Sequence, residues 1–396
     1  MSAAERNNFL IRAVIGPLRD FFHDEAAGGV LLLVATLAAL LLANSGAAEA
    51  YARFVNGSVP ALPGDVPVHA LVNDGLMTLF FLVVGLEIKR ELVEGELSSV
   101  RSAILPAVAA LGGMLVPALI YLFFNRDMPG ARGWAVPVAT DIAFSVGCLT
   151  LLKGRVPAGL AVFLTALAIF DDIGGIIVIA LSYGHGLQPL WLAGAAAVAA
   201  AVVSLGRRGI HGPATILAAG VLLWNLFHGS GIHATMAGVL LGVVVPVRER
   251  DGAEPAERMI RLLHPLVAFA IVPLFALVNA GVSLRGLRIA DLLAPVCLGS
   301  ALGLWLGKQA GIFAFTVAAV RLGLAGMPGR ASLPQLHGVS LIAGIGFTVA
   351  LFIAALAFAD HPDLLRQAKL GILSGSAAAG MSGLLVLRFA RPAKEA

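Results

Sequence analysis

Charged side chains are scarce in this chain. Lys and Arg (27) and Asp and Glu (23) make up only 13% of its 396 residues, whereas about a quarter of a soluble protein is charged. The hydrophobic fraction is 59%, and the mean hydropathy is +0.93. So few charges cannot cover a soluble surface, which argues against soluble enzymes and nucleic-acid-binding proteins.

Cysteine and aromatic residues are also few. The two cysteines, Cys148 and Cys297, lie in apolar runs and form neither a disulfide framework nor a metal-binding spacing. Aromatic residues make up 7% of the chain, while glycine occurs 46 times. Small residues at this density favour close packing of helices in lipid.

What the chain does contain is a series of apolar runs separated by short polar breaks. Because a helix needs roughly 20 apolar residues to cross a bilayer, we predict an all-α membrane protein with about twelve transmembrane helices. The predicted spans are 27–44, 68–92, 103–124, 134–152, 158–183, 190–206, 213–227, 232–246, 265–283, 295–320, 336–358 and 366–390.

The chain from 1 to 396 is expected to form one integral membrane domain, because no break is long enough for a soluble domain. A segment at 1–26 and a tail at 391–396 are expected outside the bilayer, and residues 9–22 can lie on its surface as an amphipathic helix. The longest connections, about 47–67 and 247–264, are interpreted as loops.

The distribution of lysine and arginine predicts the orientation, since cytoplasmic loops are enriched in both. Lys308 lies within a span, and the minority side carries Arg53, Arg126, Arg132, Arg285, Arg288, Arg366 and Lys369. The majority side includes both termini, which are therefore expected in the cytoplasm. Topology explains the pI of 9.4, so no nucleic-acid partner is required.

Five charged residues lie inside the predicted spans: Asp74, Asp141, Asp171, Asp172 and Lys308. A charge at the bilayer centre costs roughly 2.5–3.5 kcal/mol on insertion scales. Unpaired, the five would cost on the order of 10 kcal/mol, comparable to the stability of a whole fold. They must be paired, neutralised or hydrated, which indicates a functional site.

Asp171 and Asp172 are adjacent in one span. Neighbouring residues of a helix point about 100° apart, so the two carboxylates cannot serve the same position equally. We expect one to face a water-filled cavity and the other to face a neighbouring helix. Lys308 is the cation available within the spans to pair with that second carboxylate.

Two spans contain features that interrupt helices. Pro137 weakens the fourth span just before Thr140 and Asp141, whose oxygens suit a hard cation. Gly344 and Gly346 offer a second break in the eleventh span. Interrupted helices in comparable positions predict inverted repeats, here spans 3–5 and 10–12, with a site at the midplane.

Broken helices expose partial charges at their ends, positive at N-termini and negative at C-termini. We expect Asp141 to compensate the positive ends and Lys308 the negative ends. Continuous helices in the fourth and eleventh spans would contradict this hypothesis.

At these residues the chain closely resembles the NhaA-type Na+/H+ antiporters, over nearly its whole length. The matching segments are 81–92 (FLVVGLEIKREL), 139–144 (ATDIAF), the Asp171–Asp172 pair, 231–235 (GIHAT), 279–283 (NAGVS), 307–308 (GK) and 344–348 (GIGFT). No single segment decides the resemblance, but together they are very specific.

The resemblance implies twelve helices, with the fourth and eleventh unwound and crossing. It implies electrogenic, pH-regulated exchange of cytoplasmic Na+ or Li+ for H+, with no cofactor. By the family pattern, Asp141 and Asp172 carry the ions with Thr140 nearby, Asp171 pairs with Lys308, Asp74 lies on the pathway, and Glu87, Arg90, Glu91 and His233 belong to the pH response.

The chain departs from the family pattern at two places. Ile260 and Arg261 stand where a glutamate and a histidine are usual, which bears on the pH threshold rather than on transport. The hairpin through which some members dimerise matches residues 55–68, and here it looks shortened and contains Pro60, Pro63 and Pro67. A homodimer through this hairpin is an expectation that the prolines weaken, because proline removes hydrogen-bond donors.

Other functions were weighed against antiport. An intramembrane aspartyl protease would need a Gly-x-Gly-Asp element, which precedes none of the four aspartates, and it leaves Lys308 unexplained. A different cation/proton transporter, a cation channel or a Na+-coupled symporter stays open on sequence grounds. Coupled proton movement without a third ligand distinguishes an antiporter from the last two.

Overall fold

Apolar helices make up most of the computed structural model, which describes residues 25–59, 65–152, 155–184, 186–209, 212–248 and 254–391. Within this part of the chain, eight helices are long and apolar enough to cross a membrane, and two bent pairs raise the number to ten. The same residues contain no strand, only an isolated bridge between Ser58 and Pro67. The predicted all-α, multi-pass fold is confirmed.

Each predicted span corresponds to helical structure. In chain order the elements are α2 (Glu25–Asn44), α4–η1–α5 (Val68–Ala70, Leu71–Leu76, Met77–Val93), α6 (Val100–Asn125), η3–η4–α7 (Pro129–Gly133, Val136–Val138, Ile142–Thr150), α8 (Ala158–Ser182), α9 (Pro189–Gly206), α10 (Pro213–Ser230), α11 (Met236–Val244), α12–η5–α13 (Pro255–Leu266, Val267–Ile271, Val272–Asn279), α15–η6–α16 (Pro295–Leu302, Gly303–Gly307, Lys308–Arg321), α17–α18 (Leu333–Ile342, Phe347–Ala357) and α19 (Pro362–Phe389). The connections contain α3 (Ala48–Asn56), η2 (Glu96–Ser98), α14 (Ile289–Leu292) and η7 (Pro328–Arg330).

The ninth span begins about ten residues earlier than predicted, so the expected loop at 247–264 was drawn too long. A span-length helix runs from Pro255 to Asn279. Its first part, α12, buries Ala256 and Ile260 while Arg258 and Arg261 stay exposed. An amphipathic helix is missed when spans are located by continuous apolar runs.

The eighth span is shorter than predicted. Gly231 adopts a left-handed conformation (φ 82°) and ends α10, and α11 then starts only at Met236. The nine residues of α11 are too few to cross the hydrocarbon core, since a helix rises 1.5 Å per residue.

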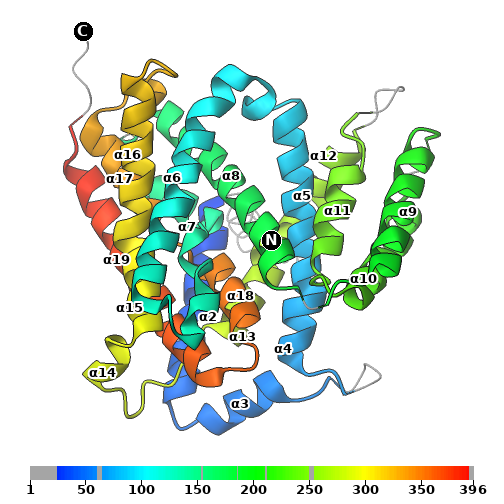
Figure 1. Ribbon diagram of the computed structural model, residues 1–396, viewed down its shortest axis with the longest axis horizontal. Coiled ribbons are helices and arrows are strands. Elements are labelled where there is room, and N and C mark those ends of the chain that lie inside the picture. The colour runs from blue at the N-terminus through cyan, green and yellow to red at the C-terminus, as the bar shows by residue number, and fades with distance from the viewer. Residues whose placement is uncertain are drawn as a thin grey trace, which may run out of the picture.

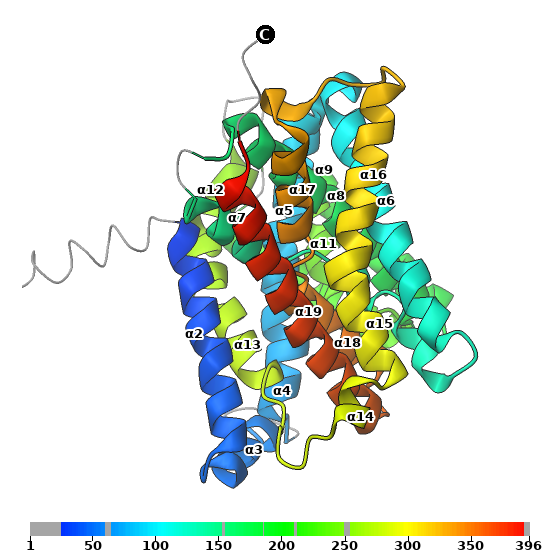
Figure 2. The same ribbon diagram turned by 90° about the vertical axis from the view of Figure 1, so that its left-hand side faces the viewer.

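The two groups of three spans have the same order of elements: long helix, broken pair, long helix. The first is α6, η4 with α7, and α8; the second is α15–η6–α16, α17 with α18, and α19. The broken pairs are bent by 40° and 44°. Helices α6 and α16 pack side by side, and α7 and α18 lie in the middle of the molecule (Figures 1 and 2). This arrangement is the one predicted for inverted repeats, and both expected breaks are present.

Glycines allow α5 and α11 to pack very closely. A Cβ atom on Gly85 would lie 2.7 Å from the Val239 carbonyl oxygen, and one on Gly242 would lie 2.7 Å from the Leu82 carbonyl oxygen. Both are backbone atoms of the facing helix, so neither can rotate away. The α5–α11 contact therefore requires these small residues.

Replacing Gly242 by Val is expected to destabilise the protein by about 1–3 kcal/mol or more, the cost of overpacking a close contact. Thermal unfolding in detergent measures the effect. Gly46→Ala is the matched control, because a Cβ atom there meets nothing within 4 Å. Equal melting temperatures for the two variants would show that the α5–α11 contact can open without cost.

Helix α3 is anchored beneath α13 by one side chain. The Tyr51 hydroxyl donates to the Leu277 carbonyl oxygen at 2.7 Å. Burial raises the pKa of Tyr51 to about 12, so the hydroxyl stays protonated and keeps donating at physiological pH. After α3, Val59 N donates to Val66 O at 2.9 Å beside the isolated bridge.

Some expectations concern residues that the structure does not describe. These are residues 1–24 of the N-terminal segment 1–26, the surface helix expected at 9–22, residues 392–396 of the tail 391–396, and residues 60–64 of the hairpin at 55–68. These expectations stay predictions.

Candidate functional site

The two broken helices meet at their interruptions. Asp141 N donates to the Ile345 carbonyl oxygen at 2.6 Å, and the Ser145 hydroxyl donates to the Ile342 carbonyl oxygen at 3.2 Å. Ala139 and Asp141 are extended, so the chain leaves helical conformation on both sides of Thr140. In a membrane, non-helical backbone is stable only where other protein groups make its hydrogen bonds. Here each break supplies hydrogen-bond partners for the other.

Gly344 and Gly346 permit this close approach. A Cβ atom on Gly346 would lie 2.8 Å from the Ala139 carbonyl oxygen, and one on Gly344 would overlap the Leu304 carbonyl oxygen. The two glycines lie in the turn between α17 and α18, where the sequence predicted the break. Their role in the structure is to let η4 and η6 touch this turn.

Asp141 lies at two helix N-termini at once. Its Oδ1 accepts from Phe144 N at 3.0 Å, which caps α7. Its Oδ2 accepts from Thr348 N at 3.1 Å and from the Thr348 hydroxyl at 2.5 Å, at the start of α18. The Asp141 side chain is buried, and the groups that donate hydrogen bonds to it belong to these two helix ends. The expectation that Asp141 compensates positive helix ends is confirmed in geometry.

Asp171 and Lys308 form the expected buried ion pair. Lys308 Nζ lies 2.8 Å from Asp171 Oδ2, and both side chains are fully buried. Lys308 Nζ also donates to the Val138 carbonyl oxygen, at the end of η4. The lysine thus faces a negative helix end, as the sequence predicted.

The Thr140 hydroxyl contacts Asp171 rather than Asp141, its neighbour in the sequence. It lies 2.6 Å from Asp171 Oδ2 and 2.9 Å from the Ala343 carbonyl oxygen, and its single proton can go to either. The hydroxyl therefore joins the Asp171–Lys308 pair, while its lone pairs stay free to bind a cation. Asp171 Oδ1 is buried and makes no hydrogen bond to any described residue.

Asp172 differs from its neighbour. Its side chain is partly exposed, and it has no hydrogen bond or ion pair with the described residues. The carboxylates of Asp171, Glu87 and Asp141 and the ammonium of Lys308 lie near enough to interact with it electrostatically. One carboxylate of the pair thus faces a neighbouring helix, as the 100° separation predicted, whereas the water-filled cavity expected at the other stays a prediction.

Asp74 and His233 come together away from these carboxylates. His233 Nε2 lies 3.4 Å from Asp74 Oδ1, and His233 Nδ1 is 2.8 Å from the Thr235 hydroxyl oxygen. Asp74 sits in the π-helical turn η1, a local irregularity that often marks functional positions. The His233 ring packs edge-on against Phe352 of α18, which links this pair to the broken helix.

The charged residues at the end of α5 join that helix to α12. Arg90 lies 3.1 Å from Glu257 and 3.4 Å from Glu91. Arg261, one of the departures from the family pattern, lies 3.7 Å from Glu257, whereas Ile260 is buried. Glu87 lies one turn before this cluster, on the side that interacts with Asp172.

Two contacts of the site were missed from sequence. Glu257 was placed in a loop, and its pairing with Arg90 required the early start of α12. Thr348 belonged to a recognised segment, but its contact with Asp141 joins residues 207 positions apart. A hydroxyl directly after a predicted helix break was the signal that could have identified Thr348.

Replacing Thr348 by Val is expected to raise the apparent KM for Na+ about tenfold, since a buried carboxylate that loses a donor costs about 1–3 kcal/mol. The backbone donor at 3.1 Å and the branched shape remain. Thr348→Ser keeps the hydroxyl and serves as the matched control. Transport measured in proteoliposomes gives the apparent KM for Na+ of each variant. Equal KM values for the two variants would rule out a role of the Thr348 hydroxyl in positioning Asp141.

Comparisons with known proteins show which family the chain belongs to. A family model described as Na+/H+ antiporter 1 matches residues 19–387. The chain is 48% identical to the Na(+)/H(+) antiporter NhaA 1 of Myxococcus xanthus over 430 residues, covering 97% of this chain and 95% of that protein. It is 50% identical to the Na(+)/H(+) antiporter NhaA of Anaeromyxobacter sp. over 422 residues, with 96% and 92% covered.

A further relative and one solved structure are also similar. The Na(+)/H(+) antiporter NhaA of Proteus mirabilis is 48% identical over 383 residues, with 95% of this chain and 97% of that protein covered. The structure of the sodium proton antiporter MjNhaP1 from Methanocaldococcus jannaschii shares 16% identity at a TM-score of 0.47, covering 93% of this chain and 99% of that one. On its match to the family model and to the NhaA sequences, the chain belongs to the Na+/H+ antiporter 1 family.

Proposed function

We propose that this protein exchanges Na+, and also Li+, for protons by competition at Asp141 and Asp172. The observation that carries the proposal is Asp172, a partly exposed carboxylate with no hydrogen bond to any described residue, close to the buried Asp141. A carboxylate can hold a proton or coordinate a cation, but not both at once. Family membership supports the same ions, since the relatives are Na+/H+ antiporters by name.

The cation is proposed to bind carboxylate and hydroxyl oxygens, the ligands that hard cations prefer. Asp141 and Asp172 supply the carboxylates, and Thr140 supplies a hydroxyl oxygen that lies 2.6 Å from Asp171 Oδ2. Asp171 is held by Lys308, so we assign it to the framework of the site.

Two carboxylates that each give up a proton for one shared Na+ move a net positive charge in every cycle. Exchange is therefore electrogenic, and a membrane potential contributes about 2.3 kcal/mol per charge per 100 mV. An interior-negative potential draws two protons in and drives one Na+ out. Low cytoplasmic pH keeps the carboxylates protonated and suppresses Na+ binding.

Alternating access is proposed to move the two repeats together against the remaining helices. The repeats contain the whole Asp141, Asp171 and Lys308 network, whereas Asp74, His233 and Glu87 lie on the other helices. A site carried by one bundle and faced by another can open first to one side and then to the other.

The pH response is proposed to involve the residues that join these parts. His233 Nε2 lies 3.4 Å from Asp74 Oδ1, and the resemblance to the NhaA-type antiporters links His233 to the pH response. Arg90 with Glu257 and Glu91, and the nearby Glu87, form the second pH-responsive group. For the location we propose a bacterial inner membrane with both termini cytoplasmic, supported by the lysine and arginine distribution.

Recovery of fluorescence from a pH-sensitive dye in proteoliposomes tests the function. Adding Na+ or Li+ to acid-loaded vesicles is expected to release protons, more strongly at alkaline pH, and a valinomycin-clamped potential should change the rate. Cation flux without proton movement would identify a channel. A requirement for a third solute would identify a symporter, and cleavage of a membrane peptide would favour a protease.

A further inference from the structure

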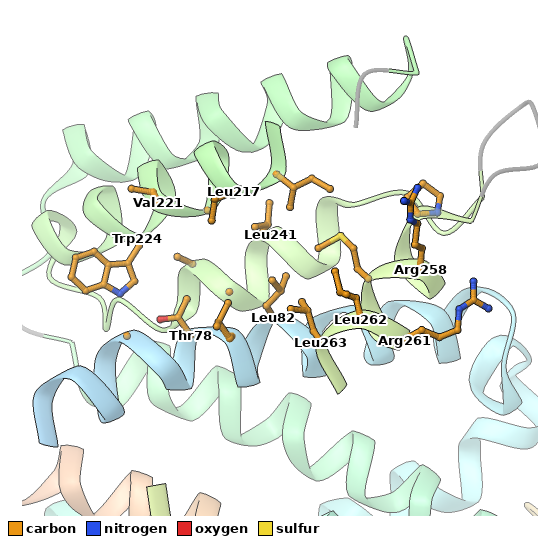
Figure 3. Close-up of a pocket in the computed structure, with 18 of the residues that line it drawn as sticks. Thr78, Leu82, Leu217, Val221, Trp224, Leu241, Arg258, Arg261, Leu262 and Leu263 are labelled. Atoms are coloured by element: carbon orange, nitrogen blue, oxygen red, sulfur yellow. The ribbon is translucent and has the colours of Figure 1, made fainter. Parts of the chain in front are cut away.

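An apolar groove lies apart from the ion site, between α5, α10, α11 and α12. Its volume is about 780 Å³, within the ~300–1,000 Å³ that small-ligand sites occupy. Figure 3 shows leucine side chains along its length, Trp224 at one end, and Arg258 and Arg261 at the other. Nothing in the proposed exchange of Na+ for protons uses this space.

The groove is open toward the hydrocarbon. Its outer apolar side chains are exposed, at 68% for Leu217, 56% for Val221 and 73% for Leu262, while Leu82 and Leu241 form its buried floor. These residues lie on membrane helices, so their exposed faces contact lipid chains rather than water. An apolar groove open to lipid is filled by lipid, because ordered water needs polar partners that this lining lacks.

The α10 wall of the groove is comparable in length to one leaflet. Along α10 the lining runs from Ile216 to Trp224, and eight residues of helix rise about 12 Å. Half of the hydrocarbon core is about 15 Å thick. Arg258 and Arg261 lie beyond this stretch, so an acyl chain that enters beside them passes Leu262 and Leu82 before it reaches the α10 wall and Trp224 (Figure 3).

The arginines at the open end lack strong partners of their own. Arg258 has no ion pair or hydrogen bond with the residues that the structure describes, and Arg261 lies 3.7 Å from a Glu257 that pairs more closely with Arg90. The one acid in the lining, Glu254, lies 3.4 Å from Arg248. Positions 258 and 261 are three residues apart on α12, so the two arginines are neighbours at the same end of the groove (Figure 3).

We propose that the groove binds an anionic phospholipid, with one acyl chain between α10 and α12 and the phosphate between Arg258 and Arg261. Basic pockets between membrane helices on the cytoplasmic side are suited to acidic headgroups. Both arginines lie on the side that the sequence predicts to be cytoplasmic. When Arg261 binds the lipid phosphate, it no longer contacts Glu257, which then pairs with Arg90 alone. Lipid binding therefore changes the ion pairs of the charge cluster at the end of α5.

Tryptophan quenching by brominated lipids tests the acyl chain and the headgroup together. The purified full-length protein is reconstituted with dibrominated phosphatidylglycerol or with phosphatidylethanolamine of the same chains. Phosphatidylglycerol is expected to quench more, and Trp224→Phe is expected to remove this excess. For Arg258→Gln with Arg261→Gln, the preference for phosphatidylglycerol is expected to fall about 10- to 30-fold, at roughly 1 kcal/mol per arginine.

The matched control is Arg321→Gln with Arg388→Gln, which removes two exposed arginines from the same side of the membrane, away from the groove. It should keep the full preference. Equal quenching by both lipids, or an excess that survives loss of Arg258 and Arg261, would overturn the proposal. If inorganic phosphate alone removes the extra quenching by phosphatidylglycerol, the arginines form a simple anion site and the proposal is wrong. If protection of Trp224 from quenching depends on protein concentration, a second copy of the chain occupies the groove and the proposal is also wrong. Transport is not the readout, so failure here leaves the proposed exchange untouched.

Discussion

Proteoliposomes containing Asp172→Asn are expected to show no Na+-driven proton release above vesicles without protein. The substitution keeps the size of the side chain but removes the one carboxylate of the central group that is partly exposed and makes no hydrogen bond to the described residues. The bound cation loses a charged ligand, a contact worth about 1.5–3 kcal/mol, which is about 10- to 150-fold in cation affinity.

The folded state of this variant should be unaffected, because no hydrogen bond is lost with the charge. A melting temperature equal to that of the unaltered protein therefore separates loss of exchange from loss of folding. Asp127→Asn is the control: its side chain is 83% exposed and pairs with the adjacent Arg126, so exchange should persist. Normal exchange by Asp172→Asn would remove this residue from the mechanism.

Lys308→Ala is expected to lower the free energy of unfolding by about 3–5 kcal/mol, the usual cost of removing one partner of a buried ion pair. Asp171 would remain fully buried without the ammonium group 2.8 Å away, with only the Thr140 hydroxyl as a donor. The Val138 carbonyl oxygen would lose its partner as well. Thermal unfolding in detergent should show a drop of several degrees.

A double variant separates the charge effect from the packing effect. Lys308→Met with Asp171→Asn removes both charges and keeps most of the volume, so much of the stability should return, because replacing both members of a buried pair is often nearly neutral. A Lys308→Ala protein that melts like the unaltered one would disprove the pairing as a source of stability. If the double variant is no more stable than Lys308→Ala, then lost packing, rather than an unpaired Asp171 carboxylate, causes the loss of stability.

The features that sequence predicted well depend on local composition and helix geometry. Long apolar runs placed most spans, since a bilayer admits few alternatives to a helix. The angle between adjacent residues and the scarcity of cations within the spans predicted that one of the two neighbouring aspartates pairs with Lys308, and the family resemblance indicated that it is Asp171. The breaks followed from Pro137, Gly344 and Gly346.

The features that sequence did not predict depend on which helices meet. Thr140 was expected beside Asp141, but its hydroxyl turns to Asp171 because the extended backbone at Asp141 points the two side chains apart. Glu257 was hidden by the amphipathic character of α12, and its partner Arg90 is 167 residues away. No pattern of neighbouring residues in the sequence indicates which residues so far apart come into contact.

The single carboxylate at the crossing ties together two segments that are remote in the chain. Asp141 caps α7, receives both Thr348 donors of α18, and its own amide reaches Ile345. A change at this one carboxylate is therefore expected to alter the contacts of both broken helices together.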